Sequence, residues 1–143
     1  MTIKFSETGR KLADGIIPAG TTVWKKCREG EIVQMIALED GIIPEENRKQ
    51  IQSKISMIVK KSGAYGYYRH FRKCRVPKVY VVSITNADGT TANSARSNEN
   101  YNFQYKVGEI VESNEFDRSP AVVCTYGIHC FLTRAEAEKY NWS

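Results

Sequence analysis

The sequence predicts an α+β fold, built mainly from antiparallel β-strands with one mid-chain helix and a short C-terminal helix. Runs of β-branched and aromatic residues recur between glycine-containing turns, which is typical of antiparallel sheets. Helical signals occur in two places, residues 45–60 and 133–140. Because 143 residues with 41% hydrophobic content suffice for one core and are few for two, we expect a single domain over residues 1–143.

The first two strands are predicted to form a hairpin. Residues 15–20 are interpreted as a glycine-flanked turn, and residues 21–26 carry the β-branched and aromatic side chains of a strand. Glu29 and Gly30 supply a tight turn before a second strand at 31–38. The nearly continuous apolar run of this second strand indicates a central position in the sheet.

The mid-chain helix is predicted over residues 45–60. A turn at Asp40 and Gly41 leads into Pro44, and proline followed by acidic residues favours a helix start. Isoleucines then recur at helical spacing, at positions 51, 55 and 58. This spacing places them on one face of a helix.

Strands are expected again in the second half of the chain. Residues 76–84 form the clearest strand, with Pro77 at its beginning or at a sheet edge. The polar residues 86–102 are expected to form a long surface loop. The alternating pattern at 103–107 and 109–111, divided by glycine, indicates one bulged strand or two short ones.

The carboxyl-terminal region is predicted as a strand followed by a helix. Residues 122–132 give the last strand region. Thr133 and Glu136 have the spacing of a capping box, in which the two side chains satisfy the first free backbone amides of a helix. The short helix is expected to end near Tyr140.

The charge of the chain favours anionic partners. Its 21 basic and 16 acidic residues give a formal net charge of +5. Because these charges are mixed rather than blocked, a small anionic molecule such as a nucleotide is a better candidate than long nucleic acid. The amino terminus lacks an apolar signal segment and no run of about 18 apolar residues occurs, so we expect a cytoplasmic protein without membrane contact.

The four cysteines are predicted to be reduced and structural. None of them forms a C-x-x-C pair, which is the usual zinc signature. A zinc set of Cys27, Cys74, Cys124 and His129 could assemble in three dimensions, but buried small hydrophobic side chains are the preferred interpretation. We therefore expect no metal and no cofactor.

Two echoing basic segments form the basis of a predicted ligand site. Residues 25–28 and 72–75 each combine a cysteine with lysine and arginine, next to a β-rich run. Alternation along a strand would bury each sulfur and display the cations, so Arg28 and Arg75 are expected to converge on an anion. The alternative is that these basic residues only solvate strand edges, where they discourage aggregation.

Aromatic residues extend this predicted site. The segment 64–71 interleaves tyrosines with arginine and histidine, a mixture that suits stacking on a base while pairing with phosphate. An aromatic core layer with solvated arginines is the alternative. The predicted ligand-binding residues are Arg28, Arg69, Arg72, Arg75, Tyr67, Tyr68 and His129.

A catalytic dyad of Cys124 and His129 is the runner-up hypothesis. Residues five apart on a strand face opposite sides, so the dyad requires a bend at Gly127. Cys124 would then be a thiolate nucleophile activated by His129. No third orienting residue is recognisable, and we prefer a core strand whose histidine hydrogen-bonds a backbone carbonyl or an acid such as Asp117.

Six motifs occur in a recognisable order between about Gly15 and Tyr140. They are Trp24-Lys-Lys-Cys-Arg28, Lys73-Cys-Arg75, Tyr105-Lys-Val-Gly-Glu-Ile-Val111, Phe116-Asp117, Cys124-x-x-Gly127-Ile-His129 and Thr133-Arg-Ala-Glu-Ala137-x-x-Tyr140. In this order the chain resembles an uncharacterised domain that follows pentapeptide repeats in proteins of large DNA viruses, and it is distantly similar to a module in phage proteins. The pentapeptide repeats are absent, and Cys130 stands where an aromatic residue usually follows the histidine. The resemblance implies a viral or phage origin and a fold, and it carries over no catalytic residue.

These patterns predict a small intracellular viral-type binding domain that engages an anionic ligand, such as a nucleotide or nucleotide second messenger, without catalysis. The first alternative is an enzyme that uses Cys124 and His129 on a nucleotide or peptide bond. The second is a virion structural or assembly protein, which would contact a host or virion protein or form a homo-oligomer.

Overall fold

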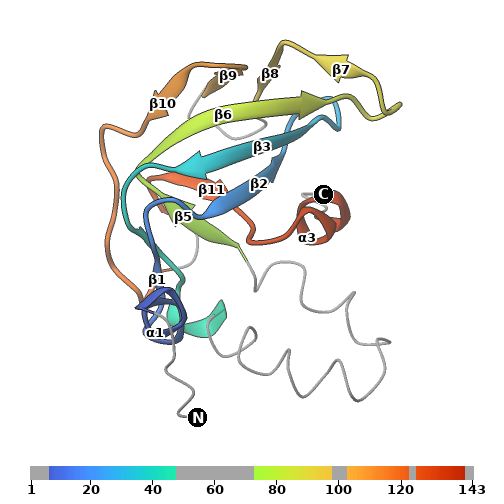
Figure 1. Cartoon of the computed structure of the whole chain (residues 1–143). Coiled ribbons are helices and arrows are strands. Elements are labelled where there is room, and N and C mark those ends of the chain that lie inside the picture. The colour runs from blue at the N-terminus through green and yellow to red at the C-terminus, as the bar shows by residue number, and fades with distance from the viewer. Residues whose placement is uncertain (1–6, 48–72, 98–102, 123–124, 141–143) are drawn as a thin grey trace, which may run out of the picture.

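The computed structural model describes residues 7–47, 73–97, 103–122 and 125–140. Two antiparallel sheets and a smaller two-stranded sheet dominate this part of the chain, and the helices α1 (Glu7–Ala13) and α3 (Arg134–Lys139) lie near its two ends (Figure 1). The predicted α+β class, with mainly antiparallel strands, is confirmed.

The larger sheet has the strand order β10-β6-β3-β2, with β7 paired to β6 outside this path. Its strands are β2 (Thr22–Lys26), β3 (Ile32–Ala37), β6 (Lys78–Thr85), β7 (Thr91–Ala92) and β10 (Ile110–Glu112). β2 and β3 form the predicted hairpin. β3 takes the predicted central place because its apolar run is buried along most of its length between β2 and β6.

The second main sheet has four strands in the order β1-β4-β5-β11 and is called the smaller sheet below. Its strands are β1 (Ile16–Ile17), β4 (Gly41–Ile42), β5 (Cys74–Val76) and β11 (Ile128–Cys130). The amides and carbonyls of Trp24 and Phe131 exchange hydrogen bonds of 2.8 and 2.7 Å, which joins β2 to the end of β11. The core draws buried side chains from both sheets, including Met35, Val81 and Ile128, all with 0% exposure.

Helix α3 packs on the β2 end of the larger sheet. Ala137 of this helix and Tyr140 after it form a second apolar cluster with Ile32 and Phe131, against which Trp24 also packs. The rings of Phe131 and Tyr140 lie 5.1 Å apart between centroids. This cluster fixes the helix beside the hairpin, and it thereby positions the charged side chains of α3 over the sheet.

The predicted cap at the start of α3 is confirmed for Thr133, which is the N-cap residue, while Glu136 bonds the Thr133 hydroxyl. The backbone amide of Glu136 donates to the Thr133 hydroxyl at 3.2 Å, and that hydroxyl donates to the Glu136 carboxylate at 2.7 Å. Replacing Thr133 with alanine removes this cap, so we expect the free energy of unfolding to fall by about 1 kcal/mol. Urea denaturation would measure the change, with T91A at an exposed strand position as the control, and equal stability of both variants would contradict a capping role.

The strand predicted at 76–84 is divided between two sheets. Val76 ends β5 in one sheet and Lys78 begins β6 in the other. Pro77 lies between them because it lacks an amide donor and cannot continue a sheet ladder. Its carbonyl accepts a hydrogen bond of 2.8 Å from the Ser113 amide.

Three segments predicted as turn or loop contain strands. The predicted turn at Asp40 and Gly41 is wrong at Gly41, which begins β4 and pairs with Ile17. The prediction of a turn over residues 15–20 is wrong at β1, where Ile16 and Ile17 pair with β4. The prediction of a loop over 86–102 is wrong for β7 and for β8 (Ser94–Arg96), since β8 pairs with β9 (Gln104–Lys106). These pairings connect segments far apart in the sequence, and short polar strands carry little local signal.

The remaining predictions have mixed outcomes. The alternative of two short strands on either side of Gly108 is confirmed, because β9 and β10 belong to different sheets. The last strand region shrinks to β11. Residues 45–47 are helical as predicted, and the rest of the predicted helix lies outside the described residues. The sequence analysis did not predict α1.

Within the described residues, the structure contains no helix that is long and apolar enough to cross a membrane.

Candidate functional site

Three of the predicted site residues, Arg28, Arg75 and His129, lie in the described part of the chain. The others lie outside it, namely Tyr67, Tyr68, Arg69, Arg72 and Cys124. The roles assigned to this second group stay predictions.

Arg75 is fully buried in the middle of β5, with 0% exposure. Its Nε donates to the Asp117 carbonyl at 2.8 Å, one terminal nitrogen donates to the Val122 carbonyl at 2.7 Å, and the other donates to the Ser119 carbonyl. The prediction that Arg75 displays its charge at the surface is therefore wrong. All three residues of β5 are buried between β4 and β11, so the guanidinium instead binds the carbonyls of segment 117–122.

His129 is the register partner of Arg75 on β11 and is only 5% exposed. Its Nε2 lies 2.7 Å from the carbonyl oxygen of Thr125, so Nε2 is the nitrogen that carries the proton in this contact. Its own carbonyl accepts a hydrogen bond of 3.1 Å from the buried Lys25 ammonium. The preferred prediction of a buried histidine bonded to a backbone carbonyl is confirmed.

Asp117, the acid proposed as a partner of His129, serves a different function. Its carboxylate accepts hydrogen bonds of 2.8 Å each from the Ser119 amide and the Thr125 hydroxyl. These two bonds lower the pKa of Asp117 below its ordinary value. Together with Arg75 and His129, this carboxylate holds segment 117–122 and Thr125 against the smaller sheet.

The described cysteines Cys27, Cys74 and Cys130 are buried free thiols, as the structural interpretation of Cys27 and Cys74 predicted. Burial raises the pKa of Cys27 and of Cys130 to about 12, and it raises that of Cys74 well above its ordinary value. These thiols are therefore protonated at neutral pH and are poor nucleophiles. Within the described ranges, no group of three or more His, Cys, Asp or Glu side chains could hold a metal ion.

Arg28 lies exposed on the turn between β2 and β3, away from the buried Arg75. The predicted convergence of these two arginines is therefore wrong. The Arg28 amide instead donates to the carbonyl of Arg96 on β8, at 3.0 Å, and the Arg96 side chain is also exposed. The prediction of a loop over residues 86–102 gave no indication that Arg96 lies on a strand beside Arg28.

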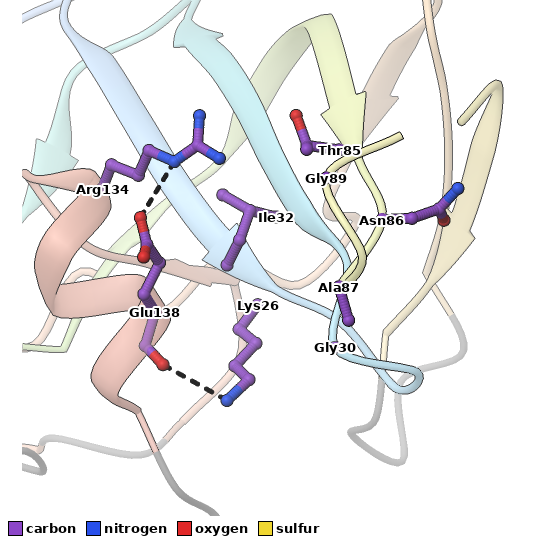
Figure 2. A pocket seen from close by; sticks show the side chains of 9 residues that line it. All are labelled: Lys26, Gly30, Ile32, Thr85, Asn86, Ala87, Gly89, Arg134 and Glu138. Carbon is purple, nitrogen blue, oxygen red and sulfur yellow. Dashed lines mark hydrogen bonds and ion pairs between the residues drawn. The ribbon is translucent and has the colours of Figure 1, made fainter. Parts of the chain in front are cut away.

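A pocket of about 360 Å³ opens beside α3 and brings charged side chains together at the surface (Figure 2). It is bounded by the end of β2, the turn at Gly30, the chain that follows β6, and one side of the helix. Ile32 lies at its centre between Arg134 and Thr85 (Figure 2). Two cations, Lys26 and Arg134, and one carboxylate, Glu138, line it.

The two cations of the pocket differ in how their charge is used. The Lys26 ammonium lies 3.3 Å from each of the Glu138 and Tyr140 carbonyl oxygens, where it stabilises the carboxyl end of α3. Arg134 binds the Glu138 carboxylate through Nε at 2.9 Å and lies over the Trp24 ring at 5.8 Å. Its guanidinium lies beside Ile32, with the terminal nitrogens on the side that faces Thr85 (Figure 2), so Arg134 lines the pocket with a charge that Glu138 partly balances.

The sequence analysis missed Arg134 as a site residue, although a signal was present. Arg134 is a cation in the first turn of a helix, where the backbone dipole disfavours positive charge. Such a placement indicates that another contact compensates, and here Glu138 one turn later and the Trp24 ring supply it.

Comparison with known protein families shows which family the chain belongs to. The profile of the family described as "Family of unknown function (DUF5758)" matches residues 2–137. The chain belongs to this family. The match covers both main sheets and the start of α3, and its description assigns no activity to the DUF5758 domain. No curated protein and no solved structure matches the chain.

Proposed function

We propose that this DUF5758 domain binds a small anionic ligand without catalysis, in the pocket beside α3. The observation that carries the proposal is the Arg134 guanidinium, which extends its terminal nitrogens over a hollow of about 360 Å³. A planar guanidinium of this kind pairs with phosphate or carboxylate oxygens in a bidentate manner. Lys26 adds positive charge, and Glu138 is already paired with Arg134.

The shape of the pocket supports a nucleotide as the ligand. Ile32 is 7% exposed and offers a small apolar contact at the pocket floor. The Thr85 residue opposite Arg134 carries a hydroxyl that can donate to a phosphate (Figure 2). A side-chain carbon built on Gly89 would meet nothing within 4 Å, so a ligand can approach this backbone closely. One available guanidinium suits a ligand with few charges, such as a cyclic nucleotide second messenger, better than a long polyanion.

The setting proposed for this activity is the host cytoplasm during viral infection. The resemblance to the domain that follows pentapeptide repeats in large DNA viruses supports it. Sequestration of a signalling nucleotide requires binding alone, which agrees with a domain whose described thiols are buried and protonated.

A host or virion protein is the alternative partner. Ile110 of β10 and Tyr80 of β6 are register partners, and both are exposed, at 57% and 38%. Exposed apolar neighbours on a sheet are a feature of protein contact surfaces. Analytical ultracentrifugation separates self-association from binding to another protein, because only self-association changes the mass of the isolated chain.

Replacing Arg134 with glutamine is expected to weaken nucleotide binding by about tenfold or more, because a charged hydrogen bond contributes roughly 1.5–3 kcal/mol. Isothermal titration against a panel of linear and cyclic nucleotides would measure it. R10Q is the matched control, since Arg10 is an exposed arginine on α1, a helix that lies apart from α3 (Figure 1). Equal affinities of R134Q and R10Q would exclude this pocket, and no heat from any nucleotide with the wild-type chain would refute nucleotide binding.

A further inference from the structure

A second pocket lies at the opposite edge of the larger sheet and has the opposite chemical character. Its volume is about 240 Å³, and it is lined by Phe103, residues 112–115, Tyr126 and Gly127. It adjoins the end of β10, whereas α3 packs at the β2 edge of the same sheet. The two pockets are therefore separate sites.

The walls of this second pocket combine aromatic rings with carboxylates. Phe103 and Tyr126 supply the rings, and Glu112 and Glu115 supply the carboxylates. Among the residues that the structure describes, no lysine or arginine lines it, although the whole chain has a formal net charge of +5. Ring faces carry negative electrostatic potential and attract cations, most strongly those with an apolar shell. The lining thus favours a positively charged group.

The two carboxylates of the second pocket differ in whether another charged side chain already lies near them. Glu112 lies 3.9 Å from the Lys78 ammonium and its side chain is 55% exposed, so this pair is long and screened by water. Glu115 is exposed and has no ion-pair partner among the described residues. Glu115 is therefore the carboxylate that can balance the charge of an incoming cation.

The backbone around the second pocket is held in place before any ligand binds. The Ser113 amide donates to the Pro77 carbonyl at 2.8 Å, and the Tyr126 carbonyl accepts from the Asp117 amide at 2.9 Å. Gly127 has a φ of 149°, and a side-chain carbon there would lie 2.9 Å from the Phe116 ring. Pre-organised walls reduce the entropy that binding must overcome.

We propose that this pocket binds an organic ammonium group, which contacts the aromatic side chains of Phe103 and Tyr126 in the pocket wall and is neutralised by Glu115. The same chemistry is offered by a free quaternary amine and by a methylated lysine side chain of another protein. The proposal is independent of anion binding beside α3, because the two sites share no lining residue.

Choline and its neutral isostere 3,3-dimethylbutan-1-ol test the proposal on the full chain. We expect choline to cause saturable shifts of the Ser113 and Gly127 amide resonances, and the isostere to bind at least several-fold more weakly, since it has the same shape without the charge. Equal shifts and affinities for the two compounds, or no saturable shift with choline, would overturn the proposal.

Variants of the lining residues test the contributions of the aromatic rings and of the carboxylates one at a time. Y126A and E115Q are each expected to weaken choline binding by about threefold to tenfold, whereas Y126F and E39Q are expected to bind as the wild type does. Tyr126 is 49% exposed and Glu39 is exposed outside the pocket, so all four variants should fold, which their amide spectra would verify. Unchanged affinity in folded Y126A would overturn the proposal. A trimethyl-lysine peptide that binds more tightly than choline would identify a protein side chain as the source, and one that binds no more tightly would identify a free amine.

Discussion

Replacing Arg75 with methionine is expected to lower the free energy of unfolding by about 3–5 kcal/mol, which is the largest effect among the described positions. Methionine keeps much of the apolar volume but cannot donate hydrogen bonds. The carbonyls of Asp117, Ser119 and Val122 would then lose the charged donors that now satisfy them. Urea denaturation followed by tryptophan fluorescence would measure the loss.

The matched control for Arg75 is Arg96, an arginine on β8 with an exposed side chain. R96M is expected to change stability by less than about 0.5 kcal/mol, as substitutions at the surface usually do. If R75M proved as stable as R96M, the three hydrogen bonds of Arg75 would not be holding the segment. The comparison removes the same charge in both variants, so it isolates the contribution of burial.

Hydrogen exchange would locate the effect of R75M within the chain. Arg75 ties segment 117–122 to β5, so amides that depend on this segment should exchange faster in the variant. The Asp117 amide, which donates to the Tyr126 carbonyl at 2.9 Å, is the most direct reporter. Amides of the β2–β3 hairpin serve as the internal reference, because that hairpin is paired independently of the segment.

Replacing Gly41 with alanine is expected to lower the free energy of unfolding by about 2–4 kcal/mol, because the new methyl group has no space. A side-chain carbon at this position would lie 2.7 Å from the Arg75 carbonyl oxygen and 2.5 Å from a methyl carbon of Val76. The first of these atoms is backbone within β5, so relief would require β4 and β5 to separate. Thermal and urea unfolding of G41A would both register the change.

Gly20 offers a control that separates crowding from backbone strain. Gly20 has a φ of 93° but open space around the position of a side-chain carbon. G20A should therefore cost only the left-handed backbone penalty, about 1–2 kcal/mol. If G41A proved as stable as G20A, or more stable, the close approach of β4 to β5 would be contradicted.

The hairpin and the final helix could be predicted from sequence because their causes are local. Glu29 and Gly30 mark the turn of the hairpin, and the strands on both sides carry the right residue types. Thr133 and Glu136 form a hydrogen-bonded pair three residues apart, so their spacing alone indicates the start of α3. Short strands such as β1 and β8 lack such local causes, since they exist only through pairing with distant segments.

The candidate site could be predicted less well than the fold. The sequence correctly indicated an interior place for Cys27, Cys74 and His129, whose residue types favour burial between apolar neighbours. It misplaced Arg75, and it assigned Arg134 only to a helix. Residue type does not distinguish a buried arginine from an exposed one, because both carry the same charge and the same five donors.

The sequence by itself determined the α+β class, the β2–β3 hairpin, the capped α3 and the burial of Cys27, Cys74 and Cys130, since these follow from residue type and spacing over a few positions. Only the tertiary structure decided which cation faces water. Arg75 is interior because carbonyls more than 40 positions away in the sequence reach its guanidinium. Arg134 faces a pocket because α3 packs beside Trp24 and Ile32. Distant backbone carbonyls thus satisfy the charge of Arg75, whereas Arg134 pairs with Glu138 one turn along its own helix and stays at the surface.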